Sequence, residues 1–116
     1  MKSIIRTAVV TFLLTVFFPL FAAAHPPANI DIEYDSETGK IAIYIAHFTP
    51  NISRHYISKV SVRRNGSVIA EEIFDSQEEA AGRSLRIRAE ELETGDTIEV
   101  EALCSIYGRK TSGITI

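Results

Sequence analysis

The side chains of this sequence best suited to bind a transition metal are histidine and cysteine, and they are few. The chain contains three histidines, His25, His47 and His55, and one cysteine, Cys104. Imidazole nitrogens and a thiolate together suit iron or copper, whereas calcium prefers oxygen ligands. If the fold brings these residues together, they could form a mononuclear metal site with an open coordination position.

Two of these residues end segments in which apolar and polar side chains alternate. Residues 97–104 alternate with glutamates on one face, so Cys104 ends the segment on the apolar face. Residues 40–47 alternate in the same way, and His47 continues the apolar phase. His55 opens the next apolar segment, just after a short loop. Because loops at one end of a sandwich cluster, we expect these three side chains to converge.

Short alternating segments separated by turn signals are typical of an all-β sandwich. The sequence Asn65-Gly66 is a two-residue hairpin signal, because both positions accept positive φ. Charged outer faces favour antiparallel pairing. The sequence therefore predicts an immunoglobulin-like antiparallel β-sandwich of about seven strands. The predicted strands are residues 29–34, 40–47, 56–63, 68–74, 84–88, 97–104 and 109–116.

Two finer expectations concern the middle of the chain. In the predicted strand 56–63, simple alternation places Ile57 on one face and Val60 and Val62 on the other. Residues 75–82 are polar and acidic, and we expect them to form a surface loop.

The N-terminus has the features of a signal peptide. Lys2 and Arg6 are basic, residues 7–18 are almost wholly apolar, and Ala22-Ala23-Ala24 supplies small residues before a cleavage site. The apolar run is short for a bilayer span, which favours a signal peptide over the alternative, a retained membrane anchor. We therefore predict a signal peptide at 1–24, a β-sandwich domain at 25–116, periplasmic or secreted localisation, and no membrane contact after cleavage.

Charge excludes one class of partner. Removal of residues 1–24 would leave all 15 acidic residues but only 10 of the 12 basic ones, a net charge of −5 with neutral histidines. Such a domain has no basic stripe to neutralise phosphates, so we expect no nucleic-acid binding. In an exported chain a single cysteine cannot form an internal disulfide. Cys104 is therefore buried and inert, paired with another chain, or bound to metal.

Two short motifs resemble the iron-binding domain of the superoxide reductase family, which includes desulfoferrodoxin and neelaredoxin. His55-Tyr56-Ile57 matches the family's His-Tyr-Ile element. Cys104-Ser105-Ile106-Tyr107-Gly108 matches its late Cys-Asn-x-His-Gly element in cysteine, spacing and glycine. His47 sits where the family has a loop histidine, although Phe48 replaces the usual proline and the loop is longer.

The resemblance implies ferrous iron held by equatorial histidines and an axial cysteine, with superoxide as the small substrate. It assigns His25, His47 and His55 as equatorial ligands and Cys104 as the axial ligand. An electron donor that the sequence does not identify would supply the electron. Tyr107 stands at the position of a fourth histidine. A neutral phenol is a poor ligand for ferrous iron, because it must lose a proton with a pKa near ~10.

Two alternatives remain open from the residues alone. One is an inactive immunoglobulin-like binding or structural module in which the metal site has degenerated. The other is a copper protein: cleavage before His25 would give one residue an α-amine and an imidazole, which chelate copper together with His47 or His55.

Overall fold

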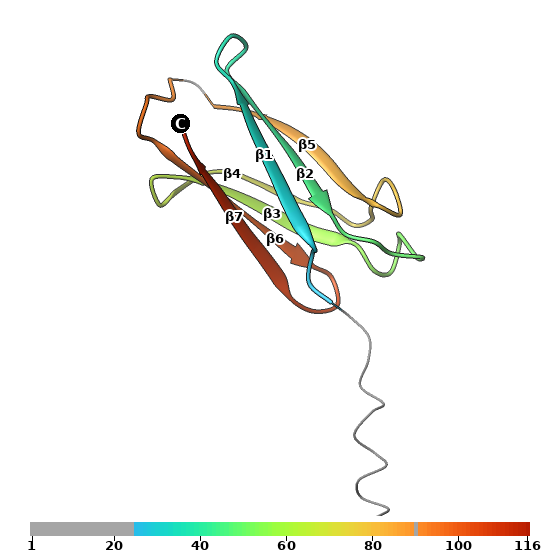
Figure 1. Ribbon diagram of the computed structural model, residues 1–116. Coiled ribbons are helices and arrows are strands. Elements are labelled where there is room, and N and C mark those ends of the chain that lie inside the picture. Colours follow the sequence, from blue (N-terminus) through green and yellow to red (C-terminus); the bar gives the residue numbers. More distant parts are fainter. Residues whose placement is uncertain (1–24, 90) are drawn as a thin grey trace, which may run out of the picture.

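The computed structural model describes residues 25–89 and 91–116, which form seven strands in two antiparallel sheets (Figure 1). The predicted all-β antiparallel sandwich is thereby confirmed, and its topology is consistent with an immunoglobulin-like arrangement. The strands are β1 (Asn29–Asp35), β2 (Lys40–Ala46), β3 (Ile57–Arg64), β4 (Ser67–Ile73), β5 (Gly82–Arg88), β6 (Thr97–Cys104) and β7 (Arg109–Thr115).

The predicted signal peptide, residues 1–24, lies outside the described residues. Within the two described ranges, no helix is both long and apolar enough to cross a membrane.

The order of the strands brings distant parts of the sequence together. One sheet has the order β1-β2-β5 and the other β4-β3-β6-β7. Because β3 and β6 are antiparallel, the beginning of β3 lies beside the end of β6, with Ile57 opposite Cys104. The pairing therefore places Cys104 and the segment just before β3, which contains His55, at one end of the four-stranded sheet.

The core lies between the two sheets and consists almost entirely of aliphatic side chains. Each fully buried isoleucine, leucine or valine side chain contributes about 1.5–3 kcal/mol relative to its exposed state. The core residues are Ile30, Ile41, Ile43, Ile45, Ile57, Val60, Val62, Leu85, Ile87, Ala89, Ile98, Val100 and Ala102.

The beginning of β3 departs from simple alternation. Ile57, Val60 and Val62 are all buried, so the prediction that Ile57 faces away from the two valines was wrong. The reason is a shift of the β3–β6 register between Ile57 and Lys59, which inserts an extra residue in β3. The bulge keeps Ile57 pointing inward, two residues after His55.

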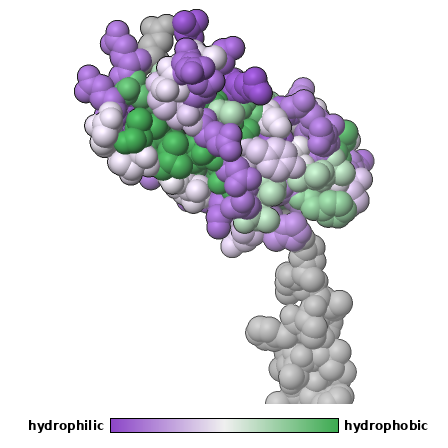
Figure 2. All heavy atoms as spheres, turned by 45° about the horizontal axis from the view of Figure 1, so that its top comes forward, coloured by the Kyte–Doolittle hydropathy of each residue, from purple (hydrophilic) through white to green (hydrophobic). Residues whose placement is uncertain are grey.

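The described surface is mainly hydrophilic, with separate apolar areas visible in one view (Figure 2). Some exposed apolar side chains belong to the edge strand β4, and others to the loops after β2 and β6. They are Phe48, Ile52, Val68, Ile69, Ile73, Ile106 and Tyr107.

β5 begins at Gly82, two residues earlier than predicted, and approaches β2 closely there. Gly82 is buried and lies opposite Ala46, and a Cβ at position 82 would overlap the carbonyl oxygen of Ile45. The close approach depends on glycine, because the obstructing atom is backbone and must shift with its strand.

We therefore expect Gly82→Ala to lower the free energy of unfolding of the metal-free protein by about 1–3 kcal/mol, as overpacking does. Chemical denaturation measures this change. Ser84→Ala, at an exposed position of the same strand, is the matched control and should stay within about 0.5 kcal/mol. Equal stability of the two variants would contradict the close approach of β5 to β2.

Candidate metal centre

Three of the predicted ligands come together at one end of the sandwich. His47 follows the last residue of β2, His55 lies two residues before β3, and Cys104 ends β6. One ligand atom from each residue lies within 4.8 Å of the others. His47 and Cys104 are buried and His55 is half-buried. The cluster therefore joins both sheets, because β2 belongs to one and β3 and β6 to the other.

His47 is held by the segment that precedes β5. Its backbone N–H donates to the carbonyl of Ala81 at 2.9 Å, and the N–H of Thr49 donates to that of Ala80 at 2.8 Å. Only 1% of the surface of His47 is exposed. These bonds continue the β2–β5 pairing beyond the strand ends and fix the backbone that carries the imidazole.

His55 is held by a tight turn and by the residue after Cys104. The carbonyl of Asn51 accepts the N–H of His55 at 2.9 Å. Ser105 donates its N–H to the carbonyl of Tyr56 at 2.8 Å, and its hydroxyl accepts the N–H of Tyr56 at 3.1 Å. Ser105 therefore fastens the backbone around His55 to the end of β6 and fixes the spacing between the imidazole and the thiol.

His25 lies at the outer side of the cluster. Its ring centre is 6.4 Å from that of His47 and 6.1 Å from that of His55, whose own rings are 4.6 Å apart. The segment is seated against Gly108, which has a φ of 88° and where a Cβ would come within 2.9 Å of Pro26. Gly108 thus permits both the turn after β6 and the approach of the N-terminal segment that carries His25.

Gln77 is a residue of the site that sequence reasoning missed. It lies in the acidic segment 75–82, which was predicted to be a surface loop, yet only 1% of its surface is exposed. Its side-chain Oε1 lies 2.9 Å from Nδ1 of His47. The prediction was wrong for this residue, because a single glutamine among acidic neighbours gives no signal of burial. The sequence also gave no sign of the bonds made by Ser105.

The donor atoms have the character of a metal site. Nε2 of both His47 and His55 is buried and has no hydrogen-bond partner in the described part of the chain. A buried polar atom without a partner is costly, so such atoms need an explanation. Two imidazoles of this kind, clustered with a buried thiol, suit a transition metal that accepts nitrogen and sulfur ligands. The His/Cys cluster could therefore bind a metal ion.

Tyr107 lies differently from the other predicted ligands, because 69% of its surface is exposed. The structure thus brings His47, His55 and Cys104 together, places His25 beside them, and leaves the Tyr107 side chain largely in solvent. A ligand role for Tyr107 stays a prediction.

A structural comparison places the fold beside a known enzyme. The superoxide reductase (1Fe-SOR) from Giardia intestinalis matches with a TM-score of 0.63, over 79% of this chain and 100% of that chain, at 11% sequence identity. At this identity the likeness shows a shared fold. The sequence itself matches no protein-family model and no curated protein.

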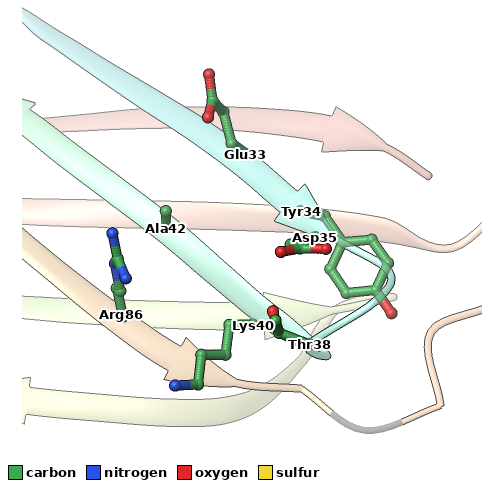
Figure 3. A pocket seen from close by; sticks show the side chains of 7 residues that line it. All are labelled: Glu33, Tyr34, Asp35, Thr38, Lys40, Ala42 and Arg86. Carbon is green, nitrogen blue, oxygen red and sulfur yellow. The ribbon is translucent and has the colours of Figure 1, made fainter.

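A separate hollow lies on the outer face of the three-stranded sheet (Figure 3). It is open above the small side chain of Ala42, between Glu33 of β1 and Arg86 of β5. The other lining residues are Tyr34, Asp35, Thr38 and Lys40, around the β1–β2 turn. Its lining carries neither histidine nor cysteine. The β1–β2 turn precedes β2 and His47 follows it, so the hollow and the metal cluster lie at different ends of that strand.

The pKa of His55 lies below its ordinary value, because burial disfavours the charged ring and the neighbouring His47 and His25 disfavour it further. The unfolded chain, with an ordinary pKa near ~6.5, takes up this proton at higher pH than the folded chain does. The folded state therefore loses stability as pH falls below about 6.5.

We expect the free energy of unfolding of the metal-free protein to fall between about pH 7.5 and about pH 5, with a smaller fall in His55→Gln. Denaturant titrations in the presence of a chelator measure both slopes. Parallel curves for the two proteins would show that His55 keeps its ordinary proton affinity on folding.

Proposed function

We propose that this chain is an exported mononuclear iron protein of the superoxide reductase type. The observation that carries the proposal is the cluster of His47, His55 and Cys104, in which one ligand atom of each residue lies within 4.8 Å of the others. Nε2 of both histidines is also buried and has no hydrogen-bond partner among the described residues. The shared fold with a superoxide reductase supports it, as do the motifs around His55 and Cys104. The signal-like residues 1–24 support export to the periplasm or the exterior.

In this proposal each residue has a distinct task. His47 and His55 provide nitrogen ligands from the two sheets, and His25 provides a third from the N-terminal segment. Cys104 provides a thiolate, which increases electron density at the metal. Bound iron would supply one electron to superoxide, and two protons from solvent complete hydrogen peroxide. A separate electron donor then restores the reduced state.

The exposed position of His25 suits the entry of a small anion. His47 and Cys104 are buried, whereas His25 is exposed at the outer side of the cluster. Superoxide is a diatomic anion and needs only a narrow path to an open coordination position. We propose that it approaches from the His25 side, away from the buried thiol.

We expect anaerobically purified protein to bind about one Fe²⁺ per chain and, when oxidised, to show a thiolate-to-ferric charge-transfer band. Cys104→Ser should lose the band and the ability to consume superoxide. Metal analysis, absorption spectra and superoxide decay measure these properties.

Val100→Ala is the matched control, since it truncates a buried side chain on the same face of β6. It should keep both the band and the activity. A wild-type protein that binds iron but never shows the band would rule out thiolate ligation. One that binds no iron would favour an inactive module.

Tyr107→Phe removes only the phenolic oxygen from an exposed side chain. We expect the iron affinity to stay within about twofold of wild type and the absorption bands to keep their positions, because substitutions at exposed positions have small effects. Loss of an absorption band together with weaker iron binding would instead identify Tyr107 as a phenolate ligand.

A further inference from the structure

We infer that Gln77 is a positioning residue of the metal centre, which fixes the nitrogen of His47 that is free to bind metal. The inference rests on the proposed function in that it assigns His47 as a ligand. It concerns a residue in the segment between β4 and β5, outside both motifs that resemble the superoxide reductase family.

The orientation of the Gln77 amide is fixed by the backbone around it. Its Oε1 accepts the N–H of Ile57 at 3.2 Å. Its Nε2 donates to the carbonyl of His47 at 2.7 Å and to that of Glu79 at 2.7 Å. A reversed amide would set nitrogen against an N–H and oxygen against two carbonyls. Backbone groups cannot exchange donor and acceptor roles, so only one orientation satisfies them.

The amide orientation in turn determines the tautomer of His47. Oε1 of Gln77 lies 2.9 Å from Nδ1 of His47 and can only accept, so Nδ1 must carry a hydrogen. A neutral imidazole has one N–H, and Nε2 of His47 is therefore left with a free lone pair. That atom is buried and has no hydrogen-bond partner in the described part of the chain. The lone pair is thus available for a metal.

Gln77 is itself held firmly on both sides. Its backbone N–H donates to the carbonyl of Ile52 at 2.9 Å. Arg83 of β5 donates to the carbonyl of Ser76 at 2.8 Å and pairs with the carboxylate of Glu78 at 3.2 Å. Its guanidinium lies 3.8 Å above the ring of Phe74.

Arg83 therefore fixes the residues immediately before and after Gln77. Gln77 also uses both lone pairs and both hydrogens of its amide in this arrangement. A buried side chain with all its hydrogen bonds made holds one position, which a group that orients a metal ligand requires. Removal of a residue that orients a metal ligand typically weakens metal binding by about 10- to 100-fold.

The first experiment reads the tautomer directly in the metal-free wild-type protein. Long-range ¹H–¹⁵N correlation spectra distinguish the protonated from the unprotonated nitrogen of each imidazole. We expect His47 to carry its hydrogen on Nδ1. A hydrogen on Nε2 would overturn the inference. Since no variant is needed, the test does not depend on how any substitution folds.

The second experiment compares Co²⁺ affinity, followed by its thiolate charge-transfer band, in wild type and Gln77→Ala. We expect about 10- to 100-fold weaker binding in the variant, together with a mixed His47 tautomer. Val100→Ala, which truncates a core residue four positions before Cys104, controls for a general loss of stability. It should bind Co²⁺ as wild type does.

The two proposals fail in different ways. Equal Co²⁺ affinity in wild type and Gln77→Ala would overturn the positioning role of Gln77 and leave the metal centre standing. A wild-type protein that binds no metal would overturn the proposed function, whereas a hydrogen on Nδ1 of His47 would still support its hydrogen bond to Gln77.

Discussion

A buried polar nitrogen that has no hydrogen-bond partner is unfavourable, and the described part of this fold carries two of them in the histidines that lie beside one buried thiol. They are Nε2 of His47 and Nε2 of His55, which are both buried. Protonation of His55 is also disfavoured, because burial and the neighbouring His47 and His25 lower the pKa of its imidazole. A bound cation would satisfy both nitrogens at once. The arrangement is therefore that expected of a site for a metal cation.

The rest of the structure serves to hold these donors in place. The β3–β6 pairing sets Ile57 opposite Cys104, and the bulge after Ile57 keeps that residue in the core. Ser105 adds bonds to the backbone beside His55. On the other sheet, Gly82 lets β5 come close to β2 just before His47. Cys104 is thus fixed by strand pairing and His47 by bonds that continue it. His55 is fixed instead by the turn from Asn51 and by Ser105. His25 depends on the N-terminal segment.

Much of the fold and part of the site could be predicted from alternation alone. Inward-facing residues of β2 and β6 recur at every second position, and this phase correctly predicted that His47 and Cys104 are buried. Asn65 and Gly66 both adopt positive φ, as their hairpin signal predicted. Patterns of this kind are local, because one strand and its neighbours determine them.

The features that escaped prediction depend on contacts between distant residues. The bulge in β3 arises from its register with β6, and a single strand carries no sign of it. Gln77 is buried because its amide reaches His47, thirty positions away, although its acidic neighbours suggest a surface loop. Such positions become visible only when the tertiary structure supplies the hydrogen-bond partners of each polar group.

The central claim is that nitrogen and sulfur donors from both sheets bind a single metal ion. X-ray absorption at the iron edge of the loaded protein tests it most directly, because sulfur and nitrogen scatter differently and imidazole rings give a recognisable pattern. The account predicts one sulfur and at least two imidazoles bound to each iron. A spectrum with light-atom ligands alone, without sulfur, would contradict it.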